Sequence, residues 1–169
     1  MADCANDIEH TTKRWHRLHK SIVKARSVLV RETITLFEFK PGVVEDSSSP
    51  AIMATATKYS KEELNAAIGH LTHMLGLITR YLGVKLPFPV FHKTMYPYVR
   101  SATAKLRHSS KMPLFLDDKN LRRFTIGMAM LNYDIAYLCH SQGVEIQLSQ
   151  VANSLQALMA CCRSQRLGL

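Results

Sequence analysis

Apolar residues recur at helical spacing near the start of the chain. Over residues 7–37 they repeat every seven positions, and further apolar residues fill some of the intervening heptad positions. This pattern predicts a helix with the apolar seam of a coiled coil. Thr11 and Glu32 interrupt the seam, so the spacing fits equally a helix that packs on its own domain. The seam residues are Ile8, Trp15, Ile22, Leu29 and Leu36, with Leu18 and Ala25 between them.

A second helix is predicted over residues 60–82. Ser60 followed by Glu63 is the capping-box pattern of a helix N-terminus. Gly83 then follows as a C-terminal cap, because glycine readily adopts left-handed backbone angles. The apolar residues between these signals are spaced four and three residues apart and predict one buried face: Leu64, Ile68, Leu71, Leu75, Ile78 and Leu82.

The segment between these two helices is predicted to be a linker. Pro41 ends the first helix, because proline cannot continue the hydrogen-bond ladder, and a run rich in serine and acidic residues follows. Residues 51–59 are expected to form a short strand at most. We therefore assign residues 1–40 to the N-terminal helix, 41–58 to the linker and 59–169 to a globular domain.

Short extended segments follow the second helix. Pro87 and Pro89 exclude a helix from residues 84–91 and confine any strand there to a sheet edge. Looser alternation of apolar and polar residues predicts short strands within 95–108 and 112–117.

A third helix is predicted to begin with a cap at Asp117 or Asp118 and to end before Gly143. Asn132 and Asp134 fall outside its apolar stripe, so we expect them to meet solvent or to cap neighbouring backbone. The expected buried face is Leu121, Phe124, Met128, Leu131, Ile135 and Leu138.

The last part of the chain predicts a fourth helix. Residues 144–148 form either a brief strand or the entry to this helix, which is expected over about 149–163. Helices that alternate with short extended pieces predict an α+β fold, with helices packed on short β-sheets. The N-terminal helix precedes this domain. The apolar face of the fourth helix is Val151, Leu155, Leu158 and Cys162.

Charge distribution adds a candidate surface. The net charge is +9, and residues 85–123 hold nine Lys and Arg against two acidic residues. Such an excess favours an anionic membrane, nucleic acid or an acidic protein as neighbour, or is simply a solvated basic face. Cations interleaved with aromatic rings suit a membrane interface and also single-stranded nucleic acid. The candidate contact residues are Lys85, Lys93, Tyr96, Tyr98, Arg100, Lys105 and Arg107; Phe88 and Phe91 are expected in the core.

Signatures of catalysis are weak. Cys139 and His140 are adjacent on a helix and point about 100° apart, so they do not form a nucleophile and base. A buried thiol is the favoured interpretation of Cys139, and a small hydrolase that uses it is the least favoured hypothesis. The four cysteines form no CxxC pair, which fits a reducing intracellular setting. We therefore expect no enzyme activity, no cofactor and no metal.

Three stretches resemble a known family. Residues 131–162, beginning "LNYDIAYLCHSQGV", look like the C-terminal part of the Barkor family, the autophagy-specific adaptor subunit of the class III phosphatidylinositol 3-kinase complex. Residues 65–90, "NAAIGHLTHMLGLITRYLGVKLPFPV", are similar to a stretch that Barkor shares with its paralogue, the UV-radiation-resistance-associated protein. Residues 24–37 resemble the end of the family's long coiled coil, especially in fungal members.

This resemblance implies a Beclin-like autophagy-related domain at the end of a coiled coil. It implies a Beclin-type partner, which we place on Trp15, Leu18, Ile22 and Leu29. It also implies a lipid kinase catalytic subunit, a protein-kinase-like regulatory subunit and an anionic membrane as partners. The expected location is cytoplasmic, peripheral on autophagosome-forming or endosomal membranes. The endosomal-sorting paralogue and a nucleic-acid-binding module remain alternatives.

The chain also departs from the family pattern. The family's N-terminal cysteine-rich segment, most of its long coiled coil and its vertebrate C-terminal amphipathic membrane sensor have no counterpart in this sequence. The chain is therefore expected to be a C-terminal fragment or a short member. Any membrane contact is then expected to come from the domain itself.

Overall fold

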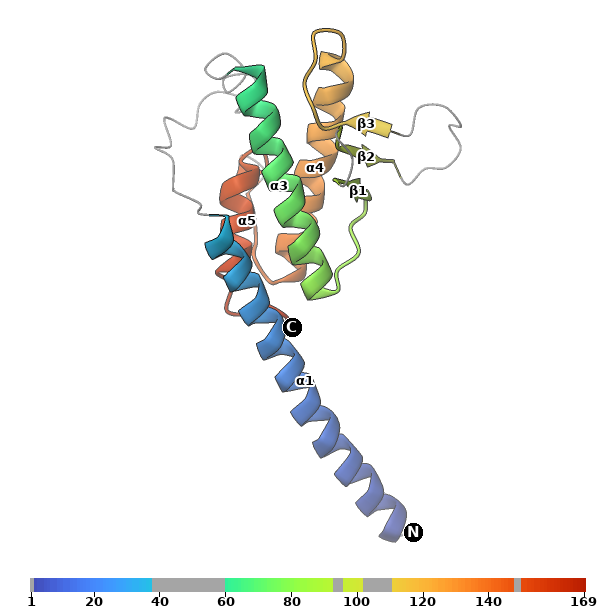
Figure 1. Ribbon diagram of the computed structural model, residues 1–169. Helices are drawn as coiled ribbons and strands as arrows, with labels where there is room; N and C mark the ends of the chain where they lie inside the picture. The colour runs from blue at the N-terminus through green and yellow to red at the C-terminus, as the bar shows by residue number, and fades with distance from the viewer. Residues whose placement is uncertain (1, 38–59, 93–95, 102–110, 148–149) are drawn as a thin grey trace.

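The computed structural model describes residues 2–37, 60–92, 96–101, 111–147 and 150–169 (Figure 1). Within these residues four helices and a small antiparallel sheet form an α+β arrangement, as the sequence predicted. The predicted linker 41–58 and the short strand at 51–59 lie outside the described residues. The elements are α1 Ala2–Leu36, α3 Lys61–Leu82, β1 Val90–Phe91, β2 Tyr98–Arg100, β3 Lys111–Pro113, α4 Leu121–Ser141 and α5 Ser154–Cys162.

The first helix has a free half and a docked half. Its N-terminal part extends away from the domain, and its C-terminal part lies beside α3 and α5 (Figure 1). Val30 and Thr33 are buried there, and Ile34 and Phe37 pack against the core. The C-terminal end of the chain fastens this junction, because Arg26 donates a hydrogen bond to the carbonyl of Gly168 at 3.4 Å.

The second predicted helix, α3, is confirmed at both ends. The Ser60 hydroxyl accepts from the backbone N–H of Glu63 at 3.2 Å, and the Glu63 carboxylate accepts from the N–H of Ser60 at 3.0 Å. Gly83 ends the helix with a φ of 70°, in the left-handed region. The core face of α3 is buried at Ile68, Met74, Leu75, Ile78 and Leu82.

The three strands form an antiparallel sheet in the order β1-β2-β3. Val90 pairs with Val99, and Val99 pairs with Met112. This row faces the core, where Val99 is fully buried and Val90 and Met112 pack against the buried cluster. Pro113 lies so close to α4 that a Cβ on Gly127 would be 2.5 Å from its carbonyl oxygen.

The start of α4 differs from the prediction. Asn120 precedes the helix and makes no side-chain cap bond; its side-chain oxygen accepts instead from the N–H of Asp117 at 2.8 Å. Asp118 forms an ion pair with Lys61, so neither aspartate caps the helix as predicted. Leu121, predicted to be buried, is 51% exposed, because the core contact of α4 begins only at Phe124.

The predicted exposure of Asn132 and Asp134 is wrong. Both side chains are buried, because α4 packs on the sheet and on α5 and so buries more than one stripe. The prediction that they cap backbone is confirmed for Asp134, whose Oδ1 accepts from the N–H of Phe88 at 2.9 Å. Asn132 accepts a hydrogen bond from the hydroxyl of Ser154 on α5.

The last helix, α5, is shorter than predicted. It covers Ser154–Cys162, and residues 144–147 form no strand. Leu158 and Cys162 are buried as expected, whereas Leu155 is 36% exposed. The final residues then fold back on α4, where the N–H of Gly168 donates to the Gln142 side chain at 2.8 Å.

We expect opposite effects from alanine at two helical glycines. A Cβ on Gly127 meets the backbone of Pro113, so Gly127→Ala forces β3 away from α4 and lowers the free energy of unfolding by about 1–3 kcal/mol. Gly69 has no atom within 4 Å of such a Cβ. Gly69→Ala therefore raises stability by about 0.5–1 kcal/mol through helix propensity. Urea unfolding measures both changes, and equal effects contradict the packing described for β3.

We expect Asp134 to make stability depend on pH. Burial raises the pKa of this carboxyl from 3.8 to about 7, although the Phe88 hydrogen bond acts to lower it. The folded protein therefore holds a proton that the unfolded chain releases between about pH 4 and about pH 7. The contribution of Asp134 to the free energy of unfolding is full below about pH 4. It is lost as the pH rises to about 7, at up to about 1.4 kcal/mol per pH unit.

The Asp134→Asn variant removes this dependence. An asparagine keeps an oxygen for the Phe88 N–H and has no charge to bury. Urea unfolding across this pH range is expected to show a flatter profile for the variant and a higher stability than the parent above pH 7. If the stabilities of the parent and the variant change equally between pH 4 and pH 7, Asp134 is not a buried ionisable group.

Candidate interaction surfaces

The heptad seam of α1 is exposed along its whole length. Its large apolar residues keep between 45% and 79% of their surface in contact with solvent. The exposed seam includes all four residues predicted to bind a partner, Trp15, Leu18, Ile22 and Leu29. Trp15 stacks on His19 with ring centroids 5.1 Å apart, but nothing in the described part of the chain covers it.

Two different apolar stripes coexist on the docked half of α1. Val30 is fully buried against the domain, while its neighbour Leu29 is 45% exposed. Leu36, one heptad after Leu29, is 79% exposed although Phe37 beside it packs on the core. The domain thus uses one side of α1, and the heptad seam, which continues from the free half, lies on another side.

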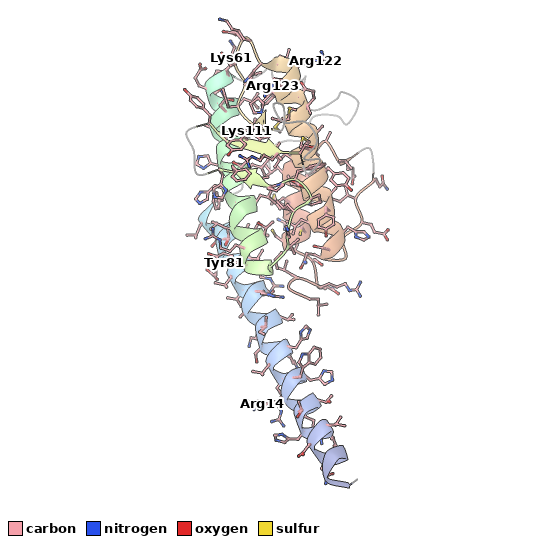
Figure 2. The ribbon with its side chains drawn as sticks, turned by 90° about the vertical axis from the view of Figure 1, so that its right-hand side faces the viewer. Arg14, Lys61, Tyr81, Lys111, Arg122 and Arg123 are labelled. Carbon is pink, nitrogen blue, oxygen red and sulfur yellow. The ribbon has the colours of Figure 1, made fainter. Side chains whose placement is uncertain are left out.

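The flanks of this seam are strongly basic. Residues 10–31 contain seven Lys and Arg and no acidic residue. Figure 2 shows one of these cations, Arg14, on the protruding part of α1. Arg26 is drawn toward the domain, whereas the others are exposed: Lys13, Arg14, Arg17, Lys20, Lys24 and Arg31.

A second exposed surface is the outer face of the sheet. Phe91, Tyr98 and Pro113 pair across the three strands and point away from the core row. The rings of Phe91 and Tyr98 stack with centroids 4.8 Å apart. Arg100 and Lys111 are direct cross-strand partners on the same face. We call these residues (Phe91, Tyr98, Arg100 and Lys111) the sheet face.

Cations and rings touch on the sheet face. The Arg100 guanidinium lies 5.0 Å from the centre of the Phe91 ring, and the Lys111 ammonium lies 5.1 Å from the centre of the Tyr98 ring. Arg123 of α4 donates to the carbonyl of Lys111 at 2.7 Å. Figure 2 shows Lys111 and Arg123 together, near the end of the domain far from the free half of α1.

The structure brings together only part of the predicted anion-contact set. Tyr98 and Arg100 lie on the sheet face, and Lys85 is exposed elsewhere, on the extended segment before β1. Tyr96 is 56% exposed and packs against the Phe115 ring at 4.6 Å. The remaining predicted contacts, Lys93, Lys105 and Arg107, lie outside the described residues.

Two residues of the sheet face were missed by sequence reasoning. Phe91, expected in the core, is half-buried and stacks on Tyr98 on the outer side, because it sits one position from the core-facing Val90. Phe88, in contrast, packs against the core as expected. Lys111 was not singled out, although its place two residues before the strand-end Pro113 sets it on the face of Arg100.

Cys139 and His140 lie on different sides of α4. Cys139 is fully buried, and its thiol donates to the carbonyl of Ala157 at 3.2 Å. Burial raises the pKa of the nearby Cys162 thiol to about 12. His140 is exposed on the other side of α4. The prediction of a buried thiol is confirmed.

Among the described residues, no group of three or more His, Cys, Asp or Glu side chains lies close enough to hold a metal ion. No helix within the described ranges has the length and apolar character needed to cross a membrane.

Comparison with known families decides the relationship of the chain. Residues 1–165 match the family described as vacuolar sorting 38 and autophagy-related subunit 14. The chain belongs to this family. Among curated proteins, Autophagy-related protein 14 of Gibberella zeae is 24% identical over 181 aligned positions, which cover 79% of this chain and 39% of that protein. No solved structure gave a significant match.

The family match agrees in extent with the resemblance seen in the sequence, since it includes both α1 and the domain. The chain spans about 39% of the length of its fungal relative. What the whole relative does is therefore carried over to this chain only as a proposal.

Two adjacent residues of α1 test the assignment of its two stripes. Val30→Asp places an unpaired charge in the core and is expected to cost several kcal/mol, enough to unfold the domain. Leu29→Asp changes the exposed seam and is expected to shift stability by less than about 0.5 kcal/mol. Thermal unfolding followed by circular dichroism measures both, and similar losses contradict the assignment.

Proposed function

We propose that this chain is a non-catalytic adaptor subunit of an autophagy class III phosphatidylinositol 3-kinase complex. In this proposal the domain is of the Beclin-like autophagy-related type, and α1 pairs with a Beclin-type subunit. The lipid kinase catalytic subunit and its protein-kinase-like regulatory subunit assemble with this pair. The family membership supports an autophagy-related role, and the resemblance to Barkor supplies the named partners.

The exposed seam of α1 is the observation that carries the proposal. Burying Trp15, Leu18 and Ile22 against a second helix removes large apolar side chains from water, and full burial of one such side chain is worth about 1.5–3 kcal/mol. The heptad spacing matches the knobs-into-holes packing of a coiled coil. The domain itself provides no cover for this stripe within the described residues.

Charge favours a different chain over a second copy. Two copies of α1 would bring two sets of seven cations together along one seam, with no acid between residues 10 and 31 to offset them. Like charges flanking a coiled-coil seam oppose pairing, and opposite charges specify it. The proposed partner therefore carries acidic residues beside its own apolar seam.

Peripheral membrane attachment completes the proposal. The chain's basic residues between 85 and 123 favour an anionic cytoplasmic leaflet, where each nearby Lys or Arg contributes about 1 kcal/mol. An adaptor bound in this way places the kinase on autophagosome-forming or endosomal membranes from the cytoplasm.

Polar substitutions on the seam test the partner pairing. Trp15→Ser and Ile22→Ser each remove a large apolar anchor of the seam, so each is expected to weaken binding of a purified Beclin-type coiled-coil subunit at least about tenfold. Lys20→Ser is the matched control, because Lys20 lies at the f position of the heptad, opposite the seam. Pulldown or calorimetry in which all three variants bind like the parent rejects the pairing.

A further inference from the structure

Two positive charges lie next to each other on the sheet face, where their repulsion lowers the stability of the fold. Arg100 and Lys111 are directly opposite each other on neighbouring antiparallel strands. Like charges at such positions are destabilising. No acidic side chain in the described part of the chain forms an ion pair with either cation, and the sequence from 84 to 116 contains no Asp or Glu. An anion bound between them would remove this repulsion.

The aromatic rings hold these cations in place without using their hydrogen-bond donors. Arg100 lies over Phe91 at 5.0 Å and over Tyr98 at 5.8 Å. A guanidinium that stacks on a ring keeps the N–H groups along its edge available for phosphate. The Lys111 ammonium lies over the Tyr98 ring, 5.1 Å from its centre. The two cations are therefore preorganised side by side and remain exposed to solvent.

The face also has the shape and composition of a membrane contact. Phe91 and Tyr98 form a flat stacked pair, and their half-buried rings are suited to the level of lipid headgroups. Arg123 adds a third exposed cation through its bond to the Lys111 carbonyl. The sheet lies on the side of the domain opposite the docked end of α1, so a partner helix along α1 does not cover it (Figure 1).

We propose that the sheet face binds the anionic surface of a lipid bilayer. Arg100 and Lys111 bind headgroup phosphates, and the rings of Phe91 and Tyr98 lie at the membrane interface. This rests on the membrane attachment in the proposed function and assigns it to one surface. It does not depend on the pairing of α1 with a partner subunit.

Vesicle flotation with the full chain tests the proposal. The parent is expected to bind vesicles of phosphatidylcholine with phosphatidylserine, to ignore vesicles of phosphatidylcholine alone, and to lose binding as salt is raised. The double variant Arg100→Gln/Lys111→Gln is expected to weaken binding about fivefold for each cation removed. Tyr98→Ser is expected to weaken it further, because the ring no longer supports the cations or enters the interface.

A matched control separates this surface from overall charge. The double variant Arg80→Gln/Arg163→Gln removes the same charge from exposed positions at the ends of α3 and α5 and is expected to bind vesicles within about twofold of the parent. Equal losses in both double variants reject the sheet face in favour of diffuse attraction.

Two other outcomes overturn the proposal whether or not the variants fold. One is parent binding to anionic vesicles that does not change with salt, which excludes an electrostatic contact. The other is parent protein that does not bind anionic vesicles; binding of single-stranded RNA by that parent protein then assigns the sheet face to nucleic acid instead. In either case, unchanged capture of a Beclin-type subunit leaves the partner proposal intact, so the two failures are distinguishable.

Discussion

The docking of one side of α1 on the domain determines which side of this helix remains exposed. Val30 and Thr33 are buried against the domain, and the bond from Arg26 to Gly168 ties the same helix to the end of the chain. Because this side of α1 is buried against the domain, the heptad seam faces solvent. Because α1 continues as one helix to Ala2, the exposed stripe extends from the domain into the free half. The helix is thus a continuous extension of the domain, with its apolar seam on the side that the domain leaves exposed.

The two candidate surfaces have different chemistry. The seam of α1 is apolar with basic flanks, which suits a helix with acidic flanks. The sheet face is small, aromatic and basic, which suits an anionic surface. In Figure 1 the free half of α1 projects away from the domain, and the sheet lies on the side of the domain opposite the docked end of α1. In the proposed function, the exposed seam binds the partner subunit and the sheet face contacts the membrane.

Local sequence signals predicted the elements whose ends and faces depend on neighbouring residues. The capping box at Ser60 and the left-handed Gly83 defined α3, and the heptad repeat identified both α1 and its seam. Local signals failed where packing between distant segments decides. Asp134 is buried where α4 packs on the rest of the domain, and the segment before β1 donates the Phe88 N–H to it. The spacing of apolar residues along α4 alone does not predict that contact.

The candidate surfaces show the same division. The four residues proposed to bind a partner were chosen from heptad spacing, and the structure leaves their side chains exposed. The sheet face was predicted only at Tyr98 and Arg100. Its other members, Phe91 and Lys111, join through the register of β1 and β3 on β2, strands that are separated along the chain by residues 92–97 and 101–110. Register across such gaps is set by which residues reach the core, and Val90, Val99 and Met112 decide it here.

Hydrogen exchange along α1 tests the central claim most directly. The account predicts fast amide exchange over the free half of the helix in the isolated chain and slower exchange where Val30 and Thr33 dock on the domain. Adding a Beclin-type coiled-coil subunit is predicted to protect amides along the whole seam, from Ile8 to Leu36. Exchange in the free half that is already slow in the monomeric chain, or that does not change with the partner, would contradict a seam held open for another helix.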